Sequence, residues 1–80
     1  MPKTYLTTED RQEAHLLAML SWKRKEADVK QEDAAKTIGI LQSTYSKKEN
    51  GKRPMTVKEF LTVCNTIGIK PSDLLKEIGI

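Results

Sequence analysis

The chain has 80 residues, of which 38% are hydrophobic and 31% are charged. A chain of this length is expected to form one domain, and this composition is typical of a globular protein rather than of a disordered segment. The densest apolar run, residues 16–20, is too short to span a membrane. The first residues contain no apolar segment of the kind that a secretory signal requires. We therefore expect a cytoplasmic protein that makes no membrane contact.

Cysteine and histidine are too scarce for most metal sites and for thiol catalysis. Cys64 and His15 are the only residues of these two types, whereas a structural zinc site needs four nitrogen or sulfur ligands. No recognisable catalytic motif surrounds either residue. The sequence therefore predicts a protein without a metal, a cofactor, a small-molecule substrate or an enzymatic activity.

The net charge of +3 is concentrated in the middle of the chain. Residues 30–53 contain six lysines and arginines against three acidic residues, whereas the charges of residues 1–29 and of residues 54–80 each sum to zero. A localised basic segment favours a polyanionic partner such as nucleic acid, although a solvated surface produces the same pattern.

Helical spacing of apolar residues, interrupted by glycine and proline, predicts five helices and no strands. Residues 1–7 are expected to form an N-terminal arm, and Thr7 or Thr8 to cap a first helix that runs to about Ala27. The second and third helices are expected at about residues 31–38 and 42–49, joined by a turn at Gly39. The residues expected to face inward from the first helix are Leu16, Leu17, Leu20, Arg24 and Ala27.

The fourth predicted helix has the clearest boundaries. Thr56 and Glu59 have the spacing of a capping box, and Gly68 suits the left-handed conformation that ends a helix. The residues expected to face inward from this helix are Val57, Phe60, Leu61, Cys64 and Ile67. Pro71 then opens a fifth helix. Its core-facing residues are expected to be Leu74, Leu75 and Ile78.

The second and third predicted helices, with the short turn between them, form a helix-turn-helix at about residues 31–50. Several residues in and around it have the spacing of a known family: Arg24, Gln31, Ala35, Gly39, residues 43–47, residues 49–54 and residues 67–69. From Leu16 to Leu75 the chain resembles the lambda-repressor-like, Cro-type helix-turn-helix proteins of the XRE family. The resemblance implies a compact, all-α, five-helix DNA-binding domain over residues 8–80, with its third helix in the DNA major groove.

The DNA-facing side is expected to combine base-reading residues with phosphate-binding residues. The amide of Gln42 suits N6 and N7 of adenine, and Lys47 is long enough to reach O6 and N7 of guanine. Ser43 and Thr44 are expected to project toward the bases from the same side. The residues expected at the phosphate backbone are Gln31, Ser46, Asn50, Lys52 and Arg53. The resemblance implies that Gln31 also braces Gln42.

Other positions are assigned to the core or depart from the family pattern. The resemblance identifies Arg24 and Glu49 as a structural ion pair between the first helix and the end of the third, and Tyr45 is expected in the core. The positions that depart from the pattern are Lys30 and Leu41, which replace helix-capping residues, Ala34, which replaces a leucine, and Lys48, which replaces an apolar residue.

One helix-turn-helix reads few base pairs, so we expect a homodimer on a palindromic operator, with half-sites about 34 Å apart. The expected dimer interface is apolar and C-terminal: Leu75, Ile78 and Ile80. The expected function is that of a sequence-specific DNA-binding transcriptional regulator, acting as a repressor. The alternative is an adaptor or antitoxin of the same fold whose main partner is another protein. Trp22 is expected outside the core, covered by Tyr5 and Leu6 or by such a partner.

Overall fold

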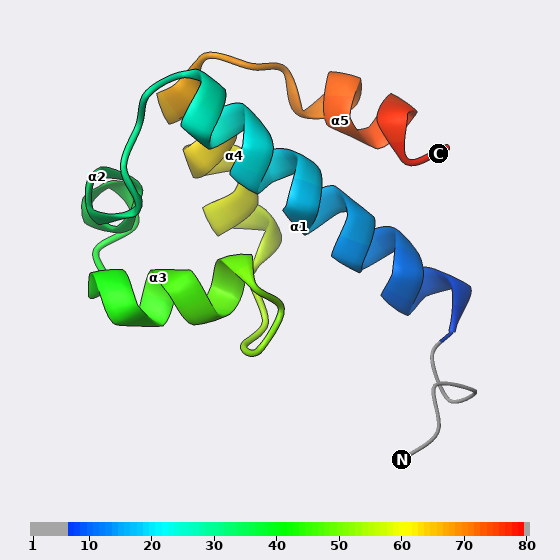
Figure 1. Ribbon diagram of the computed structural model, residues 1–80, viewed down its shortest axis with the longest axis horizontal. Helices are drawn as coiled ribbons and strands as arrows, with labels where there is room; N and C mark the ends of the chain where they lie inside the picture. The colour runs from blue at the N-terminus through cyan, green and yellow to red at the C-terminus, as the bar shows by residue number, and fades with distance from the viewer. Residues whose placement is uncertain (1–6, 80) are drawn as a thin grey trace.

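The structure of the protein, a computed structural model, describes residues 7–79. Over these residues the chain forms five helices and no strands (Figure 1): α1 (Thr8–Glu26), α2 (Gln31–Thr37), α3 (Gln42–Glu49), α4 (Val57–Ile67) and α5 (Pro71–Glu77). The predicted all-α, five-helix class is confirmed. Apart from Thr7, the N-terminal arm predicted at residues 1–7 lies outside the described residues, as does Ile80.

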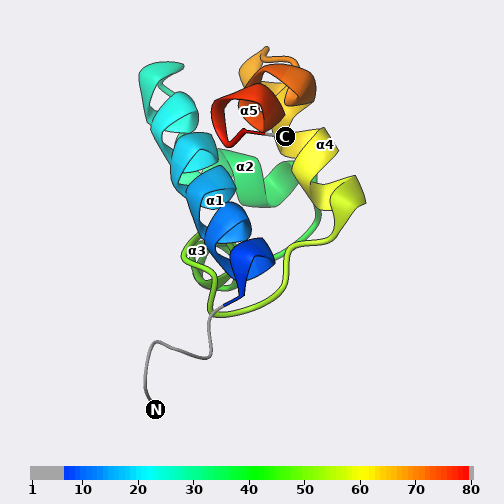
Figure 2. The same ribbon diagram turned by 90° about the vertical axis from the view of Figure 1, so that its right-hand side faces the viewer.

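The long helix α1 packs against α3, α4 and α5, while α2 packs against α3 and α4. In Figure 1, α3 lies on one side of α1 and α5 on the other, and in Figure 2, seen from the right of Figure 1, α2 lies behind α1, α4 and α5. All five helices contribute to one cluster of buried residues: Leu20, Ala34, Ala35, Tyr45, Phe60, Val63, Cys64, Ile67 and Leu74. This shared core holds α2 and α3 in a defined position on the other three helices.

Two helices begin with a capping box. The hydroxyl of Thr7 accepts a hydrogen bond from the backbone N–H of Asp10, whose carboxylate accepts one from the N–H of Thr7. Thr56 and Glu59 repeat this arrangement at α4. By contrast, α2 and α3 begin at Lys30 and Leu41 without a side-chain cap. The two helices of the helix-turn-helix therefore depend on tertiary packing for their stability.

The turn between α2 and α3 depends on one glycine. Gly39 has a φ of +72°, a conformation that costs most residues energy because the Cβ atom approaches the following carbonyl oxygen. The next residue, Ile40, donates its N–H to the carbonyl of Ala35 at 3.1 Å, which closes the end of α2. Ala34 and Ala35 are completely buried. Their small side chains let α2 pack closely against α3 and α4.

The inward face of α4 was predicted partly wrongly. Phe60, Cys64 and Ile67 are buried as expected, but Val57 is 74% exposed and Leu61 is 42% exposed. A helical side chain leans toward the N-terminus of its helix, so Val57, the first residue of α4, points beyond the packed region. Val63, which was not assigned to this face, is completely buried next to Cys64. The inward stripe of α4 is therefore rotated toward Val63 and away from Leu61.

The predicted inward face of α1 was wrong at its last residue. Leu17, Leu20 and Arg24 are buried, but Ala27 is exposed because α1 ends at Glu26. The chain turns immediately afterward at Asp28, which has a φ of +60°. Among the helices of residues 7–79, none has both the length and the apolar character needed to cross a membrane.

Candidate nucleic-acid interface

Helix α3 has one buried face and one exposed polar face. Tyr45 and Glu49, four residues apart, are both buried, whereas Gln42, Ser43 and Lys47 are exposed. Residues four apart lie on the same side of a helix, so Ser43 and Lys47 form one outward row. These three exposed side chains offer hydrogen-bond donors and acceptors, the groups that read base edges in the major groove.

The other residues predicted on this surface lie around the exposed face of α3. Thr44 and Ser46 are half-buried, so both are less accessible than Ser43 and Lys47. Asn50, Lys52 and Arg53 are exposed, and the backbone N–H groups of Lys52 and Arg53 both donate to the carbonyl of Lys47, at 2.8 and 3.2 Å. The loop after α3 is therefore folded back onto the end of that helix, which fixes the backbone positions of Lys52 and Arg53.

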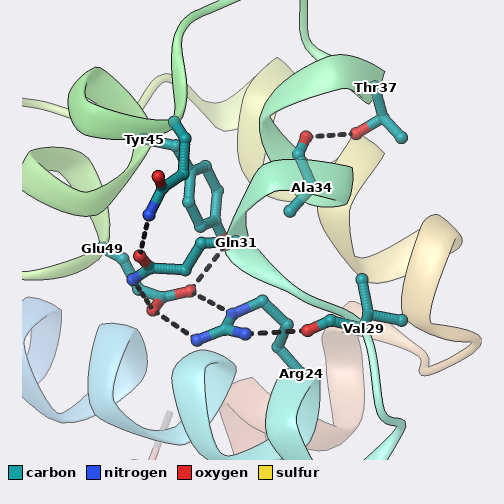
Figure 3. A network of polar contacts seen from close by, with 8 residues as sticks. Arg24, Val29, Gln31, Ala34, Thr37, Tyr45 and Glu49 are labelled. Carbon is teal, nitrogen blue, oxygen red and sulfur yellow. Dashed lines mark hydrogen bonds and ion pairs between the residues drawn. The ribbon is translucent and has the colours of Figure 1, made fainter.

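A buried ion pair anchors α3 to α1 (Figure 3). The guanidinium of Arg24 makes two parallel hydrogen bonds to the carboxylate of Glu49, Nε to Oε2 at 2.8 Å and Nη2 to Oε1 at 3.0 Å. The remaining Nη1 donates to the carbonyl of Val29 at 2.7 Å, between α1 and α2. The hydroxyl of Tyr45 donates to Oε2 of Glu49 at 2.7 Å. One arginine therefore connects α1, the segment before α2 and the end of α3.

The two glutamines of the interface extend this network to the protein surface. Gln31, on α2, donates its Nε2 to Oε1 of Glu49 at 3.1 Å. Its own Oε1 accepts a hydrogen bond from Nε2 of Gln42 at 3.0 Å. The exposed Gln42 is thus connected through Gln31 to the buried carboxylate of Glu49.

A family model described as helix-turn-helix matches residues 20–74, more than half of the chain. The protein belongs to the lambda-repressor-like helix-turn-helix family. A domain of this family is typical of DNA-binding transcription regulators, and the matched residues include all of α2 and α3. No curated protein and no solved structure gives a significant match to the chain.

The hydrogen bonds around Glu49 keep this buried carboxylate ionised in the helix-turn-helix protein. Burial by itself raises the pKa of Glu49, but the hydrogen bonds from Arg24, Tyr45 and Gln31 outweigh burial and hold the pKa below its usual value. Burial and the hydrogen bond to Glu49 raise the pKa of Tyr45, so its hydroxyl remains a donor. At neutral pH, Glu49 is therefore a pure hydrogen-bond acceptor.

A second ion pair, between α3 and α4, was missed by sequence reasoning. Lys48 donates to Oε1 of Glu59 at 2.9 Å and to the carbonyl of Pro54 at 3.0 Å. The same Glu59 oxygen accepts the N–H of Thr56 in the capping box. Lys48 therefore links the end of α3 to the far end of the following loop and to the start of α4, which explains a lysine at a position where the family has an apolar residue.

The hydrogen bond between Tyr45 and Glu49 was also not predicted, although the sequence contained a signal for it. The sequence contained no such signal for the pair of Lys48 with Glu59. Tyr45 and Glu49 are four residues apart on one helix, and this spacing brings two side chains together. Their hydrogen bond was therefore predictable once both were assigned to the inward face. Lys48 and Glu59 are separated by a loop whose path decides whether they meet, so local sequence rules carry no information about that pair.

Two of the three residues predicted at the dimer interface lie among the described residues, on helices other than α2 and α3. Leu75 and Ile78 are half-buried and line an apolar groove between α1, α4 and α5, together with Val57 and Leu61.

Trp22, on α1, is 56% exposed, and Nζ of Lys23 lies 5.4 Å from the centre of its ring.

Proposed function

We propose that this helix-turn-helix protein is a sequence-specific transcriptional repressor that binds a palindromic operator as a homodimer, with α3 in the major groove. The observation that carries the proposal is the exposed polar face of α3. Gln42, Ser43 and Lys47 are exposed on a helix whose opposite face is buried. That helix lies in residues 30–53, the segment that accounts for the net charge of +3, because the charges before and after it each sum to zero. Shape, donor groups and charge therefore all suit a DNA groove.

Within this proposal, Gln42, Ser43, Thr44 and Lys47 contact bases. Gln42 is the strongest candidate, because its amide is exposed and is held by Gln31. Residues expected to contact phosphates position the protein without specifying sequence: Gln31, Ser46, Asn50, Lys52 and Arg53. Lys52 and Arg53 are supported by the fixed loop from which they project.

The proposed dimer is supported by exposed apolar surface that a monomer does not need. Val57 and Leu61 join Leu75 and Ile78 around one groove, away from the exposed face of α3. Pairing of this surface with a second copy would remove the apolar side chains from water. It would also place two copies of α3 in one complex, which is how small helix-turn-helix proteins reach useful specificity. Occupation of the operator would then exclude polymerase.

A second candidate is an adaptor or antitoxin that uses the same fold to bind a protein. The observation in its favour is Trp22, a large aromatic side chain that is 56% exposed on α1. Tryptophan is enriched among the residues that dominate binding at protein interfaces. DNA binding remains the better-supported function, because a protein-binding adaptor does not need the polar face of α3.

Selection of bound fragments from a random duplex pool tests the proposal directly, followed by affinity measurements on the selected sequence at several salt concentrations. We expect a palindromic site bound about 10³-fold or more above random DNA. Binding that is weak, steeply salt-dependent and equal for all sequences would contradict the proposal. Trp22→Ala is the control for the second candidate, since it should leave the affinity for the selected site unchanged.

A further inference from the structure

We infer that Leu41, the residue directly before α3, recognises the 5-methyl group of a thymine beside the base pair that Gln42 contacts. The leucine takes this role in place of the helix cap that its position usually supplies in the family. This inference rests on the proposed function, because it concerns which neighbouring base the exposed end of α3 prefers.

The first observation is that Leu41 contributes little to the core. It is 74% exposed, whereas Ile38 and Ile40, on the same turn, are partly buried against the core. An apolar side chain stabilises a fold by leaving water, and this one remains in water. Leu41 is also not among the residues that line the apolar groove between α1, α4 and α5. Packing among the described residues therefore does not account for a leucine at this position.

The second observation is that the backbone of Leu41 already has the conformation of a helix cap. Its φ of −72° and ψ of 151° are close to the values of −72° and 159° at Thr56, whose hydroxyl caps α4. Its carbonyl accepts the N–H of Tyr45 at 2.9 Å, as the first hydrogen bond of α3 requires. A serine here would cap α3 as Thr56 caps α4. The leucine gives up that stabilisation, because its side chain has no acceptor.

The third observation is the place of Leu41 beside the polar face of α3. Its neighbour Gln42 is exposed and held by Gln31 at 3.0 Å. Consecutive Cα atoms are about 3.8 Å apart, so with Gln42 at a base edge the side chain of Leu41 reaches the adjacent base pair. A leucine offers no donor or acceptor to a phosphate or to a polar base edge. The 5-methyl group of thymine is the apolar group that a base pair presents in the major groove.

Three variants separate the methyl contact from the missing cap. Leu41→Ala removes the apolar contact and adds no cap. Leu41→Ser removes the same contact and adds the hydroxyl that caps α3. Trp22→Ala is the matched control, because it removes another exposed apolar side chain, from α1.

The experiment replaces each thymine of the selected operator, one at a time, by deoxyuridine, which lacks only the methyl group. The wild-type protein should lose affinity about threefold to fivefold at the thymine beside the base pair where Gln42→Ala loses discrimination, the size of one buried methyl group. Both Leu41 variants should bind the two duplexes equally, and Trp22→Ala should show the full loss. The slope of log affinity against log salt should stay unchanged in all variants, because an apolar contact releases no counterion.

Thermal melts of the free protein provide a second readout that needs no DNA. Leu41→Ser should raise Tm by about 4–8 °C, the effect of one gained helix cap in a domain of this size. Leu41→Ala should leave Tm nearly unchanged. Equal Tm values for the two variants would overturn the claim that the leucine stands in place of a cap.

The failure of this inference differs from the failure of the proposed function. A specific operator that is bound equally with and without each thymine methyl would overturn the inference and leave the proposed function standing. A methyl effect that persists in both Leu41 variants would do the same. Equal binding of all sequences by the wild-type protein would instead overturn the proposed function itself, and the inference with it.

Discussion

Single residues of this domain are expected to differ in their tolerance to change, and Arg24 is expected to tolerate little. It is 5% exposed and makes three hydrogen bonds, two to Glu49 and one to the carbonyl of Val29. A buried ion pair adds little net stability compared with an apolar pair, but removal of one partner leaves the other charge buried and uncompensated.

Arg24→Met is therefore expected to lower the free energy of unfolding by about 3–5 kcal/mol, measured by urea denaturation at neutral pH. Lys23→Met is the matched control, because the pair of Lys23 with Glu26 is a surface contact of 3.5 Å. Its loss should change stability by no more than about 1 kcal/mol. Similar effects of the two substitutions would show that the Arg24 pair is not effectively buried.

The stability of the wild-type protein and that of Arg24→Met should also depend differently on pH. The pKa of Glu49 is lower in the folded protein than its ordinary value of 4.5, so ionised Glu49 stabilises the wild type above that pH and ceases to do so as the pH falls below it. In Arg24→Met the carboxylate remains buried without its main partner, which raises the pKa. Protonation then relieves the variant, and the stability difference from wild type should shrink between pH 7 and about pH 4. A difference that is constant with pH would contradict this account.

Gln42 and Lys52 are expected to affect DNA binding in different ways. Gln42→Ala should cost about 1–3 kcal/mol on the selected operator and little on random DNA, because a base contact carries sequence information.

Lys52→Ala should weaken binding to all sequences and reduce the slope of log affinity against log salt by about one, because a phosphate contact releases counterions. Equal losses on both DNAs for Gln42→Ala, or an unchanged slope for Lys52→Ala, would remove these roles.

At the scale of helices and turns, predictability follows the strength of local signals. The capping box of Thr56 and Glu59, the left-handed Gly68 and the proline at the start of α5 placed both ends of α4 and the start of α5 accurately. The orientation of α4 was harder to predict, because the exposure of Val57 depends on where neighbouring helices end. Helix α3, rich in serine and threonine, was predicted from the helical spacing of the segment between Gly39 and Gly51, despite its poor helix propensity.

The turn of the helix-turn-helix provides a test at this scale. Gly39→Ala is expected to lower the free energy of unfolding by about 1–2 kcal/mol, because alanine is strained at the φ of +72°. A Cβ atom at this position would meet no atom within 4 Å, so a steric clash does not contribute. Gly39→Asn should be less harmful in the same thermal or urea melts, since asparagine tolerates the left-handed conformation. Equal losses for alanine and asparagine would indicate another cause.

At the scale of the whole molecule, two surfaces with different chemistry lie on different sets of helices. The polar surface belongs to α2, α3 and the loop after α3, whereas the apolar groove lies between α1, α4 and α5. Of the residues predicted to contact DNA from α3, Gln42, Ser43 and Lys47 are exposed, whereas Thr44 and Ser46 are half-buried. The sequence identified only part of the groove, because Val57 and Leu61 were assigned to the core.

Ile78→Glu is expected to weaken self-association by at least tenfold, measured by analytical ultracentrifugation, because a charge would replace an apolar side chain in the groove. Trp22→Lys is the matched control on α1 outside the groove and should leave self-association unchanged. The monomeric Ile78→Glu protein should retain weak DNA binding, since α3 is untouched. If wild-type protein is monomeric at all concentrations, or if Ile78→Glu associates normally, this face is not the dimer interface.

The division of α3 into a buried face and an exposed face affects how the protein can evolve toward new targets. Under the proposed function, substitutions at Ser43 or Lys47 would change the match to base edges without disturbing a buried side chain. New target preferences would then be accessible by mutation, or by laboratory selection, with little loss of folding. Gln42 is more constrained, because its amide is also bonded to Gln31. Divergence of target sequence is expected to begin at Ser43 and Lys47, while Tyr45 and Glu49 stay unchanged.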